Sequence, residues 1–305
     1  MPAVSVVLAT HDHACWLDGA IDSVRRQTLS EWELLVVDDG STDDTRAVVQ
    51  RHATDRRIHY LPGPHLERSA ARNRGLAAAR GALVAFLDAD DRWLPEKLER
   101  QLAVLDAEPD VPLCYTIARF VDAAGAPLPI RKPPRAIAGE VFPVLMRGNF
   151  IILASVLARR RCLAEAGGFD ETLPVYACED WDLWLRIARR HRLAIVDEEL
   201  TLYRRHDGNT GADALLRGGL AVIDRRYADP GTQAAAQLSR AAARARLRWY
   251  LAGEVAATDR GRALPLVLDA LREAPATVLA RPALGALAAV LLPRAAERAL
   301  RRLPL

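Results

Sequence analysis

The chain has 305 residues, of which 50% are hydrophobic and 27% are charged, and its formal net charge is +3. That balance is typical of a soluble globular protein and excludes a disordered chain, a collagen and a coiled coil. The positive excess is too small to indicate nucleic-acid binding, so we expect no nucleic acid among the partners.

The cysteines and the apolar runs indicate the compartment. The four cysteines lie far apart and form no CxxC pair, which argues against a zinc or redox motif and is typical of thiols kept reduced. The first residues lack the basic-then-apolar order of a signal peptide, and no apolar run reaches the roughly 18 residues of a spanning helix. We therefore expect a cytoplasmic protein.

Short apolar runs alternate with amphipathic segments over the first third of the chain. The apolar runs predict buried strands at 4–9 (VSVVLA), 33–37 (ELLVV), 57–61 and 82–87 (ALVAFL). Helical spacing or helix-forming composition follows at 16–27, 43–52, 69–80 and 95–106. Strands that alternate with such helices predict an α/β fold, with a mostly parallel sheet covered on both faces.

Acidic clusters follow two of these strands. Asp38 and Asp39 come after ELLVV, and Asp88, Asp90 and Asp91 come after ALVAFL. Ligands of a parallel sheet bind beyond the carboxyl ends of its strands, so these carboxylates indicate a ligand that is cationic or donates hydrogen bonds. The alternative is that they cap the helices that follow, because Asp is a common N-cap.

Asp88-Ala89-Asp90 has the form D-x-D. Two carboxylates on one turn repel each other unless a cation lies between them. Mg²⁺ and Mn²⁺ prefer such oxygen ligands and can hold a diphosphate at the same time. The motif alone arises often by chance, but its place at the end of a buried strand, near a second acid pair, favours a metal site.

The chain from residue 109 to 211 is less regular. PLPIRKPP at 127–134 predicts a loop, and 151–157 predicts a strand. Apolar residues from Trp181 to Ala188 recur with helical spacing and predict an amphipathic helix over 180–190, with Glu179 and Asp180 at its start.

After residue 211 the strand-like runs end, and the chain becomes rich in Ala, Leu and Arg. We therefore predict one domain over residues 1–211 and an all-helical extension over 212–305, with three or four helices in 235–305. The last helix, expected over 278–292, is trailed by Arg294, Arg298, Arg301 and Arg302. Packing as a helical bundle is the favoured interpretation, and peripheral contact with the inner face of a membrane is the alternative.

Four longer segments carry a family resemblance. VSVVLATHDHACWLDGAIDSVRRQTLSEWELLVVDDGSTDDT resembles the opening of family 2 glycosyltransferases, which have the GT-A fold. ARNRGLAAARGALVAFLDADDRWLPEKLERQ, GGFDETLPVYACEDWDLWLRIA and YRRHDGNTG continue the resemblance in the family's order, over about residues 4–211.

The resemblance implies a bacterial-type enzyme of cell-envelope polysaccharide synthesis. Such an enzyme transfers a sugar, with inversion, from a nucleotide diphosphate sugar, with a UDP-sugar favoured, to a hydroxyl of a glycan or lipid-linked acceptor. Residues of about 1–108 would form the nucleotide-binding half of the GT-A catalytic domain, and about 109–211 the acceptor half.

The resemblance also implies a donor site. Asp39 would accept a hydrogen bond from the base, and Thr10 and His11 would line the base pocket, with His11 where the family often has a stacking Tyr. Asp88 would face the ribose and a metal-bound water. Asp90 would bind the metal, Mn²⁺ or Mg²⁺, which bridges the two phosphates.

Five other residues are candidates near the donor. His206 in YRRHDGNTG matches a family position that often approaches the metal, and the alternative is a solvated loop histidine. Arg68 and Arg72 would contact the base or the phosphates, and the alternative for each is a solvated helix face. Arg204 and Arg205 could clamp the diphosphate.

Inverting transfer also needs a base, because the acceptor hydroxyl loses its proton as it attacks the anomeric carbon. Asp180 matches the family's base, and its alternative role is to cap the helix that it begins. Glu179 would orient the acceptor or Asp180, and pairing of two acids raises the pKa of one of them, which suits a base.

Two other functions compete with this interpretation. A nucleotidyltransferase acting on sugar phosphates also uses a parallel sheet, paired acids and Mg²⁺, but LATHDHACWLDG lacks the Gly-rich phosphate loop that it normally has near the first strand. A non-catalytic sugar-nucleotide-binding module is the other, and the intact set Asp39, Asp88, Asp90 and Asp180 speaks against it. The oligomeric state stays open.

Overall fold

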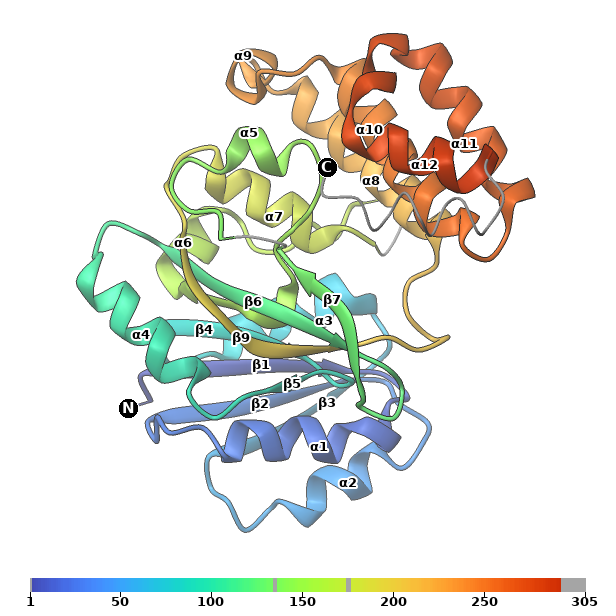
Figure 1. The fold of residues 1–305 in the computed structure, drawn as a ribbon. Helices are drawn as coiled ribbons and strands as arrows, with labels where there is room; N and C mark the ends of the chain where they lie inside the picture. The colour runs from blue at the N-terminus through green and yellow to red at the C-terminus, as the bar shows by residue number, and fades with distance from the viewer. Residues whose placement is uncertain (1, 134–135, 174–176, 292–305) are drawn as a thin grey trace. The chain divides into compact units, whose positions relative to one another are not determined.

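A computed structural model describes residues 2–133, 136–173 and 177–291 (Figure 1). Contacts within the chain divide it into two compact units. The first comprises Met1–Val141, Phe150–Thr172 and Glu179–Asn209. The second comprises Phe142–Asn149, Leu173–Cys178 and Thr210–Leu305.

The first unit is built on one sheet with strand order β3-β2-β1-β4-β8-β6-β9-β5, and β7 pairs with β6. The strands are β1 (Val4–Thr10), β2 (Trp32–Asp39), β3 (Ile58–Gly63), β4 (Leu83–Asp88), β5 (Arg92–Trp93), β6 (Leu113–Val121), β7 (Pro127–Lys132), β8 (Val156–Arg159) and β9 (Ala194–Arg204). The helices of this unit are α1 (Ala14–Arg25), α2 (Thr45–Arg51), α3 (Glu67–Ala78), α4 (Lys97–Ala107), α6 (Arg160–Glu165) and α7 (Glu179–Ala188).

The sheet is mixed in direction. Strands β3, β2, β1 and β4 run parallel, so the carboxyl ends of these strands meet at one edge. Beyond β4 the direction changes, because β8 pairs antiparallel with both β4 and β6, while β9 runs parallel to β6. The acids that follow β2 and β4 therefore lie at the same edge of the sheet.

Alternation along β1 sends its side chains into two different layers. Val4, Val6 and Leu8 belong to the core that includes α1 and α2 (Figure 1). Val7 points to the opposite face, where α3 packs. Helix α3 approaches closely because Gly75 has no side chain: a Cβ there would lie 2.4 Å from Cγ1 of Val7.

The structure differs from the sequence prediction in the middle of this unit. PLPIRKPP does not form a loop, because Pro127–Lys132 is β7. Within the part of the chain that the structure describes, this strand pairs only with β6, and an edge strand tolerates proline because half of its N–H groups need no partner. The strand expected at 151–157 is a short 3-10 turn, Leu153–Ser155, followed by β8, and strands β6 and β9 were not predicted.

The second unit is helical. Its elements are α5 (Phe142–Leu145), α8 (Ala212–Ala228), α9 (Thr232–Ala236), α10 (Arg240–Ala256), α11 (Arg260–Glu273), a 3-10 turn η2 (Pro275–Leu279) and α12 (Arg281–Leu291). Helices α10, α11 and α12 pack around Trp249, whose Nε1 donates to Oγ1 of Thr277 at 2.9 Å.

Two predictions concern the end of this unit. The last described helix begins at Arg281, three residues later than expected, and Leu292, Arg294, Arg298, Arg301 and Arg302 lie outside the described residues. Among the described helices, none combines the length and the apolar character that crossing a membrane requires.

Candidate active site

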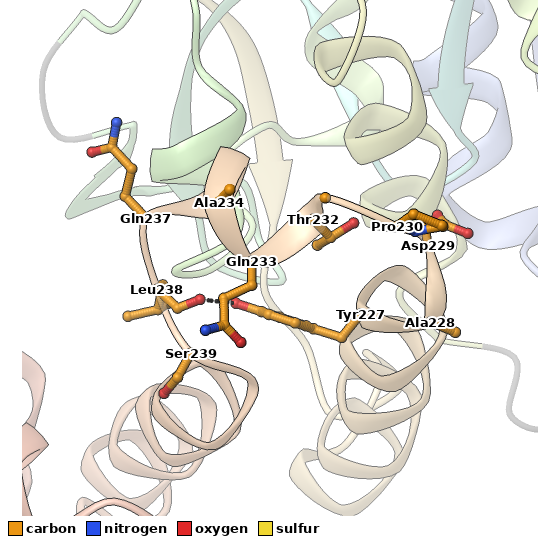
Figure 2. Close-up of a pocket in the computed structure, with 11 residues that line it drawn as sticks. Tyr227, Ala228, Asp229, Pro230, Thr232, Gln233, Ala234, Gln237, Leu238 and Ser239 are labelled. Atoms are coloured by element: carbon orange, nitrogen blue, oxygen red, sulfur yellow. Dashed lines mark hydrogen bonds between the residues drawn. The ribbon is translucent and has the colours of Figure 1, made fainter.

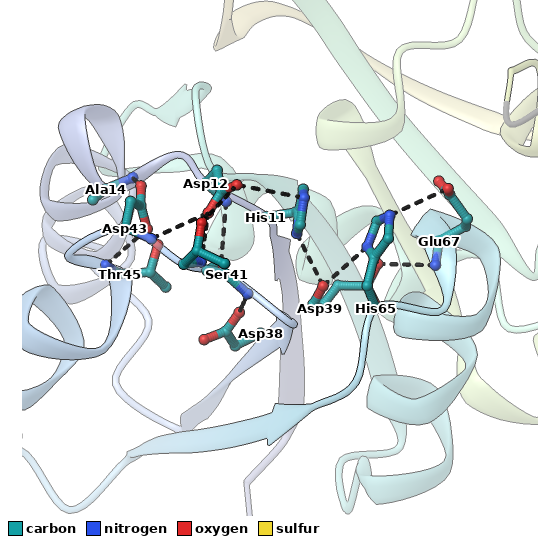
Figure 3. Close-up of polar contacts among 11 residues, drawn as sticks. His11, Asp12, Ala14, Asp38, Asp39, Ser41, Asp43, Thr45, His65 and Glu67 are labelled. Atoms are coloured by element: carbon teal, nitrogen blue, oxygen red, sulfur yellow. Dashed lines mark hydrogen bonds and ion pairs between the residues drawn. The ribbon is translucent and has the colours of Figure 1, made fainter.

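The loops that follow β1 and β2 hold each other in place (Figure 3). The Asp12 carboxylate accepts from the main-chain N–H of Thr42 at 2.7 Å and of Asp43 at 3.2 Å. The Asp43 carboxylate accepts in return from the N–H of Ala14 at 2.9 Å. The N–H of Thr42 is the main cause that lowers the pKa of Asp12 below its usual range. These bonds fix the shape of the loop that begins with Thr10 and His11.

Asp39, the last residue of β2, binds the start of α3. Its two carboxylate oxygens accept from the main-chain N–H groups of Leu66 and Glu67, each at 2.9 Å. Glu67 has φ of 75°, a left-handed conformation that is uncommon for a residue with a side chain. The helix dipole stabilises an anion at this end, and together with the two N–H groups it holds the Asp39 carboxylate in one place.

Two histidines lie beside Asp39 (Figure 3). The rings of His11 and His65 stack with centroids 4.2 Å apart, and their Nδ1 atoms lie 3.0 and 3.1 Å from the main-chain oxygen of Asp39. That oxygen is the main cause that raises the pKa of His65, and the carboxylates of Asp39 and Glu67 add to it. The result is a flat, polar-edged surface at the ends of β1 and β3.

Gly40 makes room for this arrangement. Its φ is 79°, and a Cβ at this position would lie 2.7 Å from the main-chain nitrogen of His65. Both facts require glycine here, since other residues rarely adopt this conformation and would collide with the backbone before α3.

Asp88 and Glu179 are joined by one guanidinium. Arg72 of α3 donates from Nη2 to Oδ1 of Asp88 at 2.8 Å and from Nη1 to Oε1 of Glu179. Burial alone would lower the pKa of Arg72, but the carboxylates of Asp88 and Glu179 raise it above its usual value. The buried Arg72 thus ties the end of β4 to the first turn of α7.

Asp90 contacts His206. Oδ2 of Asp90 lies 2.9 Å from Nε2 of His206, and Nδ1 of His206 accepts from the N–H of Gly208 at 3.1 Å. In the neutral ring Nε2 therefore carries the proton that is donated to Asp90. The indole of Trp16 lies against the same imidazole, with ring centroids 4.1 Å apart.

Asp91 and Arg204 have structural partners. Oδ1 of Asp91 accepts from the main-chain N–H of Arg204 at 2.9 Å, so Asp91 does not cap the following helix. Burial, with the nearby Asp90 and Asp88 charges, raises the pKa of Asp91 well above its usual range. The Arg204 side chain donates to the carbonyls of Asp90, Asp122 and Ala123. In this structure it therefore holds two loops together instead of pointing toward a diphosphate.

Asp180 follows Glu179 in the first turn of α7. Its Oδ1 accepts from the N–H of Trp181 at 2.7 Å, and its side chain is half-buried. Because Glu179 is tied through Arg72 to Asp88, Asp180 lies on the helix end that this ion pair anchors. The structure thus links the D-x-D motif, through the buried Arg72, to Glu179, the residue that precedes the predicted base.

A comparison with protein families matches the part of the chain that forms this edge of the sheet. The family model described as glycosyl transferase family 2 matches residues 5–157, which include β1 from its second residue, β2 to β4 and the D-x-D motif. The chain belongs to this family.

Relatives of this glycosyltransferase are found in archaea and bacteria. An uncharacterized glycosyltransferase of Methanocaldococcus jannaschii is 29% identical over 208 residues, which are 67% of this chain and 71% of the relative. A putative teichuronic acid biosynthesis glycosyltransferase of Bacillus subtilis, TuaG, is 41% identical over 106 residues, 33% of this chain and 41% of the relative. The chain spans about a third of the length of three rickettsial relatives that it also matches.

Solved structures establish the fold class. S. aureus TarS, residues 1–349, aligns with a TM-score of 0.64 at 17% identity, over 99% of this chain and 92% of that one. The mannosyltransferase PcManGT of Pyrobaculum calidifontis, solved with GDP-Man and Mn²⁺, aligns with a TM-score of 0.61 at 18% identity, over 99% and 88%. The GT-A fold predicted for this glycosyltransferase, with a helical C-terminal region, is confirmed.

The side chains of this glycosyltransferase suit a metal ion that is bound partly by the protein and partly by a nucleotide, rather than one bound by protein ligands alone. Among the described residues, no three His, Cys, Asp or Glu side chains converge closely enough to hold an ion. Asp90 and His206 offer one oxygen and one nitrogen 2.9 Å apart. Mg²⁺ and Mn²⁺ at nucleotide sites usually take one or two protein ligands and complete their shell with water and phosphate oxygens, so this pair fits such an ion.

The sequence-predicted residues fall into two groups. Asp39 and His11 lie together after β1 and β2, and Thr10 is buried there with no hydrogen-bond partner for Oγ1 among the described residues. Arg72 brings Asp88 to Glu179, and Asp90 meets His206. Arg68 lies exposed on α3.

Sequence reasoning missed His65 and Trp16. The stack of His65 on His11 depends on the turn at Gly40 and on the start of α3, which no local pattern predicts. Trp16 was assigned only to a helix, although it lies three residues after His13 in a loop-to-helix junction that ends at the site.

The glycosyltransferase also has an open depression of about 750 Å³ in its second unit (Figure 2). It is lined by residues 227–234 and 237–239, and the Tyr227 hydroxyl donates there to the main-chain oxygen of Leu238 at 2.7 Å. It contains none of the candidate residues, and its wall has no charged side chain besides Asp229.

Proposed function

We propose that this family 2 glycosyltransferase is a metal-dependent inverting enzyme that transfers a sugar from a nucleotide diphosphate sugar to a hydroxyl. The observation that carries the proposal is the contact of Arg72 with both Asp88 and Glu179. It puts the end of the D-x-D strand and the acidic turn of α7 into one cluster, as a reaction between a bound donor and a deprotonated acceptor requires.

The base of the donor is proposed to bind at the ends of β1 and β2. The stacked rings of His11 and His65 offer a flat face, and Asp39 offers an acceptor at its edge. Uracil presents an N3–H donor to such a group, so a UDP-sugar is favoured. TarS has been solved with UDP-GlcNAc, and PcManGT with GDP-Man, which places nucleotide sugars in related folds.

Asp90 and His206 are proposed to hold a divalent ion, with Asp88 toward the ribose. An ion there, Mn²⁺ or Mg²⁺, would offset the negative charge that grows on the leaving diphosphate. Binding through Nε2 of His206 requires that the proton now shared with Asp90 leave this nitrogen. Arg72 orients Asp88 through the hydrogen bond from its Nη2.

Asp180 is proposed as the base. In a single displacement the acceptor oxygen bonds to the anomeric carbon, its proton passes to the Asp180 carboxylate, and the nucleoside diphosphate leaves with the bonding electrons. Glu179 is neutralised by Arg72, so it positions the turn that carries Asp180.

We assign catalysis to residues 1–211 and propose a glycan or lipid-linked acceptor, with the enzyme working in the cytoplasm. The relationship to TuaG, which is named for teichuronic acid biosynthesis, supports a role in cell-envelope polysaccharide synthesis.

Thermal unfolding with UDP-, GDP- and dTDP-sugars, each with and without Mn²⁺, tests the proposal. A ligand that binds only the folded state raises its midpoint. We expect a rise with a UDP-sugar that needs Mn²⁺. A rise that is equal without metal, or a rise with sugar phosphate and nucleoside triphosphate instead, would contradict it.

A further inference from the structure

Glu67 has a strained backbone that its main-chain contacts do not explain. Its φ is 75°, and it is one of four non-glycine residues with a left-handed φ in the part of the chain that the structure describes. A residue with a long side chain loses stability in this conformation. The N–H of Glu67 donates to Oδ2 of Asp39 at 2.9 Å, but glycine would make the same bond without strain. The side chain of Glu67 therefore needs a reason of its own.

The Glu67 side chain contacts His65. Its Oε1 lies 3.2 Å from Nε2 of His65, and Nδ1 of the same ring lies 2.9 Å from Oδ2 of Asp39 (Figure 3). A neutral imidazole has one N–H, so it donates to one of these carboxylates and turns a lone pair toward the other. Both contacts are favourable only when both ring nitrogens carry a proton, which makes the ring a histidinium.

The groups around His65 come from three parts of the first unit. Asp39 ends β2, Glu67 begins α3, and the loop after β1 brings His11, whose ring stacks on His65 with 22° between the two planes. Asp12 lies beyond His11, with Oδ2 3.6 Å from Nε2 of His11. The main-chain oxygen of Asp39 and the carboxylates of Asp39 and Glu67 all raise the pKa of His65. These surroundings favour a positive charge on His65.

The helix dipole offers another reason for an acid at the start of α3. Glu67 is the first residue of this helix, where a carboxylate is favoured. An acid at the next position of the same turn would gain as much from the dipole with an ordinary helical φ. The dipole therefore does not explain why the acid stands at the strained position, whereas the contact with His65 does.

We propose that Glu67 is a positioning residue of the nucleotide site, which holds His65 as a histidinium in its stack with His11. The inference rests on the proposed function, in which these two rings receive the base of a uridine nucleotide. A charged ring binds this ligand better than a neutral one, because a cation is attracted by the π-face of the base and by the negative charge of the diphosphate.

Calorimetric titration with UDP and Mn²⁺ tests the role of Glu67. Glu67→Gly should bind UDP about fivefold more weakly, the upper end of what a half-exposed ion pair contributes. Gln237→Gly is the matched control and should bind UDP like wild type, because Gln237 also has a left-handed φ, 51°, but lies in the second unit. Both glycine variants should melt at the wild-type temperature or up to about 2 °C above it, since each removes a strained residue.

The dependence of UDP affinity on pH separates positioning from a merely structural role. The ring of His65 is charged below its pKa in the folded protein, so UDP affinity should fall as pH rises through that value. Glu67→Gln keeps the size of the side chain and one acceptor oxygen but loses the charge that raises the pKa of His65. The fall should therefore begin at lower pH in this variant, while the ionisation of UDP itself is common to both proteins.

The outcomes separate this role from the proposed function. Wild type that does not bind UDP would contradict the proposed function, on which the role of Glu67 depends. UDP binding by wild type that Glu67→Gly retains in full would overturn the role of Glu67 alone, and so would identical pH profiles of wild type and Glu67→Gln. A lower melting temperature of Glu67→Gly with unchanged UDP affinity would show instead that Glu67 serves only to stabilise α3.

Discussion

Nε2 of His206 lies 2.9 Å from Oδ2 of Asp90, although 116 residues separate the two in the chain. Asp90 ends the D-x-D motif after β4, and His206 follows the last strand of the sheet, β9. The contact joins the loop after β4 to the end of the first unit, at the edge where the acids gather.

Asp90→Ala should abolish Mn²⁺-dependent binding of the nucleotide sugar. The variant removes one of the two side chains that are proposed to bind the ion, and His206 with phosphate oxygens alone should not hold it. Calorimetric titration with UDP-sugar, with and without Mn²⁺, measures this. Asp106→Ala, an exposed carboxylate at the end of α4, is the control and should bind like wild type. Tight Mn²⁺-dependent binding by Asp90→Ala would refute the assignment.

Asp180→Asn should lower the rate of transfer by about 10² or more while donor binding stays nearly unchanged, because an amide does not accept the acceptor's proton. The rate is measured at saturating donor and acceptor, and donor affinity is measured separately. Equal transfer rates for the variant and wild type would show that another group is the base.

Arg72→Met should lower the free energy of unfolding by about 3 to 5 kcal/mol, because it leaves Glu179 and Asp88 as neighbouring carboxylates without their shared cation. Urea unfolding measures the change. Arg100→Met is the matched control: its pair with Glu198 is exposed on both sides, at 3.8 Å, and should contribute less than about 1 kcal/mol. An equal, small effect of both variants would contradict the bridging role of Arg72.

Lys97 gives a dependence of stability on pH. Its side chain is fully buried over the ring of Trp93 and donates to Oε1 of Gln101 at 2.8 Å, and burial lowers its pKa to about 7. Between this value and the usual one near 10.5, the unfolded chain holds a proton on Lys97 that the folded chain does not. Unfolding therefore takes up a proton, and the Lys97 contribution to stability rises as pH increases across this window.

Lys97→Met should lose that contribution. Urea unfolding of both proteins from pH 7 to 10 measures it, and the difference in slope belongs to Lys97 because the other titrating groups are common to both. Parallel pH profiles would show that the Lys97 pKa is not lowered in the folded protein.

The sequence predicted the first half of the fold well because each element there is strongly patterned. Fully apolar runs such as VSVVLA and ALVAFL begin and end within two residues of β1 and β4. Strand β9 was missed because its middle, Asp197-Glu198-Glu199, is polar, and its pairing with β6 contains register shifts. Strand β7 was missed because proline at an edge looks like a loop without the partner strand.

The candidate site was predictable in its residues but not in its contacts. Asp88, Asp90 and Asp39 stand at strand ends that a parallel sheet must bring to one edge. The double contact of Arg72 was not accessible, since Glu179 is 107 residues away and Arg72 has the spacing of a solvated helix face. The place of His65 depends on a left-handed turn at Gly40 rather than on a local motif.

The reciprocal bonds between the loops after β1 and β2 have a dynamic consequence. The Asp12 carboxylate accepts from the N–H groups of Thr42 and Asp43. In return, the Asp43 carboxylate accepts from the N–H of Ala14, and the Ser41 hydroxyl accepts from the N–H of Asp12. If either loop opened alone, amides of the other loop would lose their hydrogen-bond partners. Deuterium should therefore enter the amides of Asp12, Ala14, Thr42 and Asp43 at a common rate, as a single cooperative opening.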